Sequence, residues 1–197
     1  FLIAERVAME NRRDDCAATK LIRQMAKRRV DQINRDVKKI EKQMRDVISR
    51  YTQLDHDRKI IESIPGIGFL SACTVFAELG DLRRFGRDRQ LVAFVGVNPC
   101  IRDSGTSVHG RAHMSKSGNA RIRQALYMAA LVAIRMPGPL KDTYSRLVAV
   151  GKKKMVALGA VMRKLLVLMR ALLVANKHYD KNYRGCGKGC GKAATQI

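Results

Sequence analysis

The apolar residues between Val30 and Leu54 recur at alternating steps of three and four. Neither proline nor glycine interrupts the chain from Ala4 to Leu54. This repeat puts its apolar side chains on one stripe of a helix, and such a stripe needs a partner helix to cover it. The sequence therefore predicts a long helix over residues 1–55 and favours its self-association as a coiled coil in a homo-oligomer. Packing of the helix on its own domain is the alternative.

The positive charge is concentrated in the second half of the chain. The net charge is +22, and residues 98–175 alone contain 14 Lys or Arg and two Asp or Glu. A surplus of this size repels itself unless a polyanion neutralises it, so the pattern predicts a nucleic-acid partner. A very soluble or ribosomal-type basic protein is the alternative. An aromatic content of 5% without Trp argues against recognition of RNA by base stacking, although not against binding to its backbone.

A proline- and glycine-containing turn separates two helical patterns over residues 58–79. Pro65 cannot continue the first helix, whereas Gly66 and Gly68 can take positive φ and bring bare backbone close to a ligand. The N–H groups of such a turn, and of the helix after it, can hold a phosphate. The segment is predicted to be a helix-hairpin-helix unit that contacts the DNA backbone. A tight turn between packed helices is the alternative.

The rest of the chain predicts an all-α fold with a compact helical domain over residues 56–175. Further helices are expected over 90–95, 119–135, 140–150 and 154–175, and the tail 176–197 is expected to be disordered. In the helix over 119–135, the residues predicted to face the core are Ile122, Leu126, Ala129, Ala130 and Ala133.

The loop over residues 98–118 is the strongest candidate for chemistry, because it places hydroxyls beside Arg and Lys. A serine that attacks a phosphodiester needs cations around the phosphorus and a group that takes its proton. The candidate cations are Arg111, Lys116, Arg121 and Arg123, and the candidate proton acceptors are Asp103, His109 and His113. A loop that grips phosphate without chemistry is the alternative. A short hairpin turning near His109 and Gly110 is also expected.

Two of these arginines, Arg121 and Arg123, fall in the first turn of the helix over 119–135. The helix dipole disfavours cations there, so an anionic ligand over this helix end is expected.

Several other classes are disfavoured. Five scattered cysteines form no disulfide framework, which fits the reducing cytoplasm of a bacterium. Cys186 and Cys190 lack the further ligands of a zinc site, and no metal site is expected in this chain. The apolar run from Val156 to Ala175 is interrupted by three cations, so no membrane span is predicted. Residues 98–175 contain too few carboxylates for a two-metal nuclease.

Five blocks in this order resemble the C-terminal transposase domain of the insertion-sequence "one-ten" family, whose members are RNA-guided DEDD-plus-serine recombinases. The blocks are Ser63-Ile64-Pro65-Gly66-Ile67-Gly68, Ala77-Glu78-Leu79-Gly80, the stretch from Gln90 to Pro99, the stretch from Ser104 to Gly110, and the stretch from Met114 to Asn119. The resemblance covers about 56–175, and over the coiled coil only the pattern agrees.

The resemblance implies that the first serine of the S-G-x-S-V block, Ser104, is the nucleophile. It implies strand cleavage through a transient DNA–phosphoserine link, followed by strand exchange that a guide RNA directs. Ser107 and Ser115 are the next candidates. The residues expected to contact double-stranded DNA are Pro65, Gly66, Gly68, Arg102, Ser107, Arg111, Lys116, Asn119, Arg121 and Arg123.

In that family Mg²⁺ is held by four acidic residues of an N-terminal RNase H-like domain, which does not precede Phe1 in this sequence. Two expectations stay open. As a fragment of a longer protein, the chain would supply the serine of an intact transposase. As a complete protein, it would be a non-enzymatic DNA-binding module or an inactive remnant.

Overall fold

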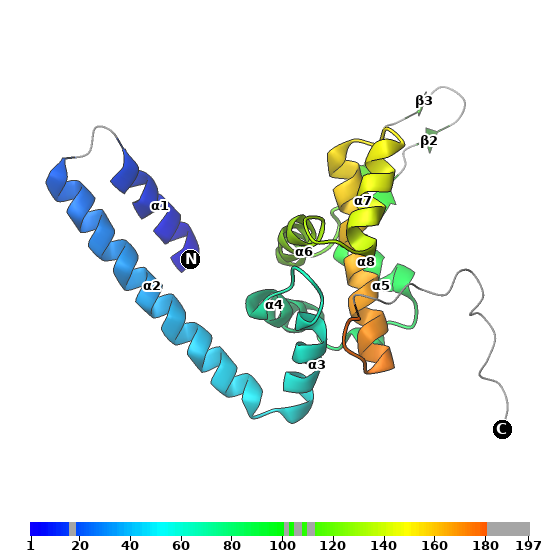
Figure 1. Cartoon of the computed structure of the whole chain (residues 1–197), viewed down its shortest axis with the longest axis horizontal. Coiled ribbons are helices and arrows are strands. Elements are labelled where there is room, and N and C mark those ends of the chain that lie inside the picture. The colour runs from blue at the N-terminus through cyan, green and yellow to red at the C-terminus, as the bar shows by residue number, and fades with distance from the viewer. Residues whose placement is uncertain (16–18, 101–102, 105–107, 110–112, 181–197) are drawn as a thin grey trace. The chain divides into compact units, whose positions relative to one another are not determined.

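A computed structural model describes residues 1–15, 19–100, 103–104, 108–109 and 113–180. Within these residues the chain forms eight α-helices, one short 3-10 helix and two short antiparallel strand pairs (Figure 1). The predicted all-α class is therefore confirmed. The chain divides into two compact units, Phe1–Asp55 and His56–Ile197.

In the first unit, α1 (Leu2–Asp14) packs against α2 (Lys20–Ser49). The prediction of one continuous helix is wrong, because α2 has its own start at Thr19, whose side chain accepts a hydrogen bond from the N–H of Ile22 at 3.4 Å. A side-chain cap of this kind satisfies an orphan N–H and begins a helix without any help from proline or glycine.

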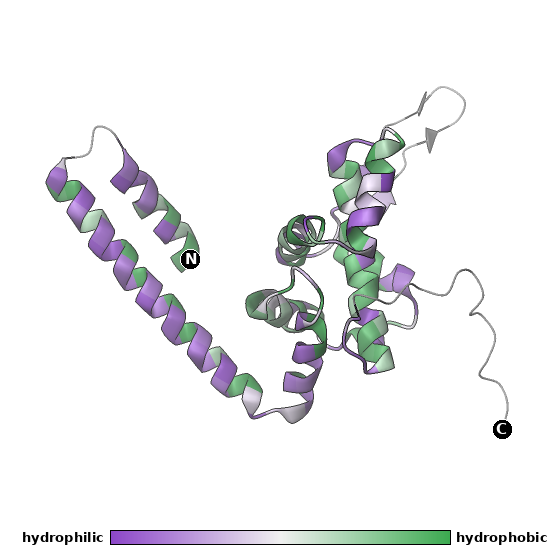
Figure 2. Ribbon diagram, viewed as in Figure 1, coloured by the Kyte–Doolittle hydropathy of each residue, from purple (hydrophilic) through white to green (hydrophobic). Residues whose placement is uncertain are grey.

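The apolar stripe of α2 is covered over only part of its length. Ala26, Val30 and Ile33 are buried, whereas Ile40 and Val47 are 45% and 50% exposed. Figure 2 shows that α2 is largely hydrophilic, with hydrophobic residues recurring along it. Helix α1 of the same chain thus packs on the helix that carries the stripe, and self-association remains a prediction.

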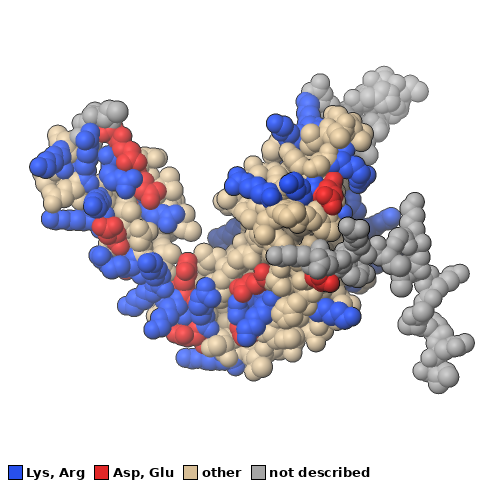
Figure 3. Space-filling view, viewed as in Figure 1, with Lys and Arg blue, Asp and Glu red and all other residues tan. Residues whose placement is uncertain are grey.

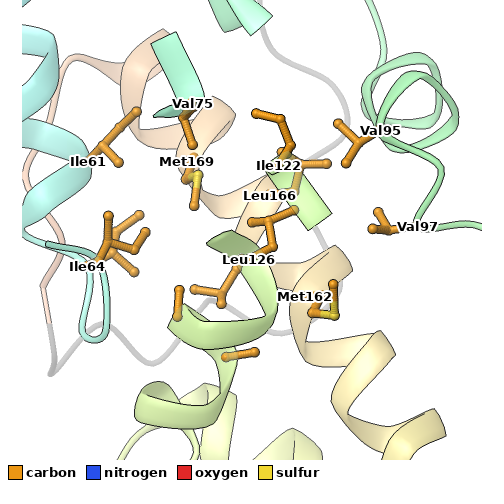
Figure 4. Packing of buried hydrophobic residues seen from close by; sticks show 14 of the residues in the cluster. Ile61, Ile64, Val75, Val95, Val97, Ile122, Leu126, Met162, Leu166 and Met169 are labelled. Atoms are coloured by element: carbon orange, nitrogen blue, oxygen red, sulfur yellow. The ribbon is translucent and has the colours of Figure 1, made fainter. Parts of the chain in front are cut away.

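The second unit is built around α8 (Lys154–Ala175), which packs against the other helices of its core. These are η1 (Leu82–Arg84), α5 (Asp88–Val95), α6 (Ala120–Ala133) and α7 (Pro139–Ala149). Figure 4 shows Met162, Leu166 and Met169 of α8 facing side chains from several of these elements. In the described part of the chain, no helix is long and apolar enough to cross a membrane. The five inward residues predicted for α6 are all buried.

Helices α3 (Thr52–Glu62) and α4 (Phe69–Leu79) flank the proline–glycine turn. Ile64 and Ile67 of this turn are 1% and 6% exposed, so the turn itself contributes to the core. Gly66 has φ +91°, and a Cβ at this position would lie 2.4 Å from the carbonyl oxygen of Ala129 in α6. A glycine is therefore required here by both the backbone conformation and the close approach of α6.

An ion pair with a buried carboxylate connects α3 to η1. Asp57 is 6% exposed, and its two carboxylate oxygens accept hydrogen bonds from Nη1 and Nη2 of Arg83, both at 2.7 Å. The Nε of Arg83 donates to the carbonyl of Leu173 at the end of α8, at 3.0 Å. The hydrogen bond with Asp57 raises the pKa of Arg83 above its ordinary value, against the opposing effect of burial. One guanidinium thus joins α3, η1 and α8.

The substitution Asp57→Asn should destabilise the second unit by about 2 kcal/mol, because the buried position loses the carboxylate that accepts two hydrogen bonds from Arg83. The matched control is Asp88→Asn. Asp88 also pairs with an arginine, Arg170, at 2.7 Å, but its side chain is 48% exposed. That change should cost about 1 kcal/mol or less. Urea unfolding followed by circular dichroism measures both, and equal losses would contradict the structural role of the buried pair.

Candidate nucleic-acid interface

The predicted loop over 98–118 contains four short strands. β1 (Pro99–Cys100) pairs with β4 (His113–Met114), and β2 (Asp103–Ser104) pairs with β3 (Val108–His109). Both pairs are antiparallel, so the chain runs out and returns along itself. The prediction of a turn near His109 and Gly110 is wrong, because His109 is itself paired and the chain reverses between Ser104 and Val108.

The strand register locates the backbone of the predicted nucleophile. Ser104 lies opposite Val108, and the preceding residue, Asp103, lies opposite His109. Residues directly opposite in an antiparallel pair have their Cβ atoms about 5 Å apart. Two of the three candidate proton acceptors are therefore cross-strand neighbours, one position from Ser104. The side chain of Ser104 lies outside the described part of the structure, as do residues Arg102, Ser107 and Arg111.

The segments that lead into the β1–β4 pair are held together by a very close backbone approach. Gly96, with φ +74°, ends α5, and a Cβ on it would lie 2.7 Å from the nitrogen of Gly118. A Cβ on Gly118 would lie 2.1 Å from the carbonyl oxygen of Phe94. These contacts are to backbone, which cannot move aside as a flexible side chain does. The end of α5 and the segment before α6 are held together only because both positions lack a side chain.

Hydrogen bonds extend this junction toward the strands. The N–H of Ser115 donates to the carbonyl of Asn98 at 3.0 Å, and the N–H of Lys116 donates to the carbonyl of Gly96 at 3.1 Å. The Ser115 hydroxyl donates to Oδ1 of Asn98 at 2.8 Å and lies 3.1 Å from the hydroxyl of Ser117. Ser115 is thus engaged in holding the base of the β1–β4 pair. Lys116 takes φ +55°, unusual for a residue with a side chain, and is exposed.

A carboxylate of the chain itself lies over the start of α6. Asn119 begins α6 by accepting a hydrogen bond from the N–H of Arg121 at 2.8 Å, and its amide donates to Glu78. Nη1 of Arg121 donates to the other carboxylate oxygen of Glu78 at 3.2 Å. Glu78 was not predicted as a partner of Arg121. A carboxylate near the C-terminus of α4 is disfavoured by the dipole of that helix, which indicates a compensating cation.

The guanidinium of Arg123 is engaged in hydrogen bonds to backbone carbonyl groups. Its Nη1 donates to the carbonyl of Gly118 at 2.5 Å and to that of Val95 at 3.2 Å. The arginine therefore ties together the two segments that meet at the glycine contact. Arg121, by contrast, has a side chain that is 82% exposed.

The proline–glycine turn presents one open position. Gly68 begins α4 with φ −99°, so it does not use the positive φ predicted for it, and no atom lies within 4 Å of a Cβ built there. The first N–H groups of a helix have no partner within the helix. Gly66 faces α6, and Pro65 is half-buried. Of the three predicted contacts in this turn, Gly68 is therefore the one with open space beside it.

The most concentrated charge in the second unit is a lysine cluster, defined as Lys152, Lys153 and Lys154. Lys152 and Lys153 lie between α7 and α8, and Lys154 is the first residue of α8. All three are exposed, and none pairs with an acidic side chain in the described part of the chain. Figure 3 shows several Lys and Arg side chains over the part of the second unit that contains α7, with few Asp or Glu among them. Among the described residues, no group of three or more His, Cys, Asp or Glu could hold a metal ion.

Substitution of Gly118 by Ala should destabilise the second unit by about 3 kcal/mol or more, because the new methyl group would overlap the backbone at Phe94 and Val95. Gly68→Ala is the matched control, and it should leave stability nearly unchanged because that position is open and extended. Thermal unfolding of the two variants measures the difference. A stable Gly118→Ala protein would contradict the close backbone contact.

Comparison with known proteins finds matches to the segment that contains the features described above. The sequence model of the "Transposase IS116/IS110/IS902 family" matches residues 58–145. The pilin gene-inverting protein of Moraxella bovis is 29% identical over 147 residues, covering 74% of this chain and 45% of that protein. The transposase for insertion sequence element IS1111A of Coxiella burnetii is 38% identical over 81 residues, covering 41% of this chain and 22% of the relative.

A third relative, the insertion element IS116 uncharacterized 44.8 kDa protein of Streptomyces clavuligerus, is 33% identical over 119 residues. That alignment covers 60% of this chain and 30% of the relative. The matched part of the chain thus spans less than half the length of each of these relatives. The family match includes the proline–glycine turn, the α5–α6 junction and the strand pair with Ser104. Residues 58–145 of the chain thus match the IS116/IS110/IS902 family of transposases.

Proposed function

We propose that this chain is the DNA-handling part of a transposase that cleaves and exchanges strands with Ser104 as nucleophile. The observation that carries the proposal is the pairing of Ser104 with Val108 in β2–β3, inside the family-matched segment. The glycine contact, the Ser115 hydrogen bonds and Arg123 hold the segments that flank the β1–β4 pair, on either side of β2–β3 in the chain. A nucleophile has to be held at a defined place relative to its phosphate, and a segment with fixed ends favours this.

In the proposed step, Oγ of Ser104 attacks the phosphorus of a DNA phosphodiester. An O–P bond forms while the bond from phosphorus to the leaving deoxyribose oxygen breaks. The serine proton passes to a nearby base, for which Asp103, His109 and His113 are the candidates, and the leaving oxygen takes up a proton. Attack by a deoxyribose hydroxyl of a second strand then reverses the step and joins the new strands.

DNA is proposed to contact the second unit through its exposed cations. Lys116, Arg121 and the lysine cluster are exposed, and they belong to the strongly basic stretch that begins at residue 98. Such contacts fix the position of the duplex and carry no base sequence information. The open N-terminus of α4 at Gly68 adds backbone N–H groups to this set.

The described residues do not fit a Mg²⁺ site, since they contain no cluster of three potential ligands. Any Mg²⁺ and guide RNA of the reaction are therefore assigned to parts beyond these residues, in line with the family resemblance. Self-association through α2 is also part of the proposal. A reducing bacterial cytoplasm is the proposed location, in line with the five scattered cysteines of the sequence.

Ser104→Ala should abolish a covalent protein–DNA adduct, because alanine has no oxygen to attack phosphorus. DNA affinity should change less than about twofold, since the hydroxyl is expected to stabilise the transition state and to contribute little to DNA binding. The assay uses the chain with nicked duplexes that trap the adduct, followed by denaturing electrophoresis, and fluorescence anisotropy for affinity.

The control for this experiment is Ser115→Ala, which also removes one hydroxyl from the same segment. It should lower the yield of the adduct without abolishing it, because the Ser115 hydroxyl donates to Asn98 beside the β1–β4 pair. An adduct that persists in Ser104→Ala and disappears in Ser115→Ala would move the nucleophile to Ser115. DNA binding by the unaltered chain with no adduct under any condition would favour the second candidate, a non-enzymatic DNA-binding module. The concentration of positive charge supports that candidate without requiring chemistry.

Replacement of all three lysines of the cluster by Gln should lower the salt dependence of duplex binding. Each lost phosphate contact reduces the slope of log K against log salt concentration by about 1, so the triple variant should lose about 3. The matched control replaces Lys38, Lys39 and Lys42 of α2, which lie among acidic residues. Binding isotherms at several salt concentrations measure both slopes, and equal reductions would contradict the assignment of DNA to the second unit.

A further inference from the structure

A cavity of about 600 Å³ lies within the second unit, between the β1–β4 pair, α6 and the first half of α8. Its walls are mainly apolar and include Val97, Met114, Tyr127 and Met162. Sites of this volume hold ligands the size of a nucleoside or a small drug molecule. The cavity is therefore large enough for a defined ligand, and its walls favour one with an apolar surface.

Two small residues of α8 create the space. Gly159 and Ala160 line the cavity at a point where larger side chains would project into it. A Cβ on Gly159 would meet Cε of Met114 at 3.2 Å, which is the flexible end of a side chain from β4. The cavity is thus bounded by the β1–β4 pair.

The rim of the cavity is positively charged. Lys116 and Arg163 contribute to its lining, and both are exposed. Neither pairs with an acidic side chain anywhere in the described residues. Lys116 is held at the rim by its backbone hydrogen bond to Gly96 and its unusual φ of +55°. An apolar pocket with two free cations at its mouth complements a ligand that has a flat apolar body and an adjacent anion.

We propose that this cavity receives a single unpaired nucleobase of the bound DNA, with the flanking phosphates held by Lys116 and Arg163. The proposal rests on the proposed DNA function of the chain and adds a second contact to it. A nucleobase has apolar faces that pack against an aromatic ring such as that of Tyr127. Its polar edge can exchange hydrogen bonds with the side-chain amides of Asn98 and Gln124, which also line the cavity.

An unpaired base is required because a paired base would first have to leave its stack. That cost is lowest where a base already lacks a partner. Strand exchange leaves bases without partners while one strand replaces another. The cavity would then hold such a base beside the strand pair and keep the exchanging strand in register with Ser104.

The test compares the affinity of the full chain for a duplex with one unpaired 2-aminopurine and for the fully paired duplex. The unpaired base should raise affinity about tenfold, as one stacked base typically does, and its fluorescence should become protected from acrylamide quenching. Ala160→Trp fills the cavity and should remove both effects while leaving affinity for the paired duplex unchanged. Ala171→Trp, on an exposed position of the same helix, should retain both effects.

A second variant keeps the test decisive if Ala160→Trp fails to fold. Gly159→Leu should also fill the cavity, and it replaces a helical glycine by a better helix former, while the contacting end of Met114 is free to shift. Equal affinity for the two duplexes in the unaltered chain would overturn the inference. Preference for the unpaired base that survives a folded, filled variant would overturn it too, while DNA binding itself stands. A chain that binds neither duplex would overturn the proposed function and this inference together.

Discussion

The contact between Gly96 and Gly118 constrains the whole candidate interface. Backbone meets backbone at distances that no Cβ allows, so the end of α5 and the segment before α6 behave as one piece. The hydrogen bonds of Ser115 and Lys116 begin from this piece and lead into β1 and β4. Arg123 connects the two segments by donating to one carbonyl group in each of them. The β1–β4 pair is therefore anchored by residues that pack and bond, and Ser104 follows β1 along the chain.

The cations of the second unit fall into two groups with different tasks. Arg83, Arg123 and Arg170 donate to carbonyl groups of other segments and hold elements together. A planar guanidinium with several fixed donors suits this role better than a lysine does. Lys116, Arg163 and the lysine cluster have no acidic partner among the described residues. A count of basic residues therefore overstates the charge that a polyanion can reach, and the lysine-rich surface is the more informative part.

Part of the candidate site could be predicted from the sequence. The proline–glycine turn, the helix beginning at Asn119 and the basic strand segment all follow from local signals, because turns and caps depend on neighbouring residues. The partners within the site could not be predicted. Glu78 and Arg121 are 43 residues apart, and Arg123 and Val95 are 28 apart, so no local pattern joins them. Glu78 supplies a carboxylate over the start of α6, and the anionic ligand expected there stays a prediction.

The sequence by itself determined the all-α class, the helices from α4 onward and the basic character of the second half, since periodicity, capping residues and charge are local properties. The three-dimensional structure decided why the glycines occur where they do. Gly66 and Gly118 make room for a neighbouring backbone, whereas Gly68 faces open space. It also decided that Asp57 is buried against Arg83 and that a cavity opens beside α8. These features depend on which distant segments meet, and that is fixed only when the apolar faces of the helices pack together.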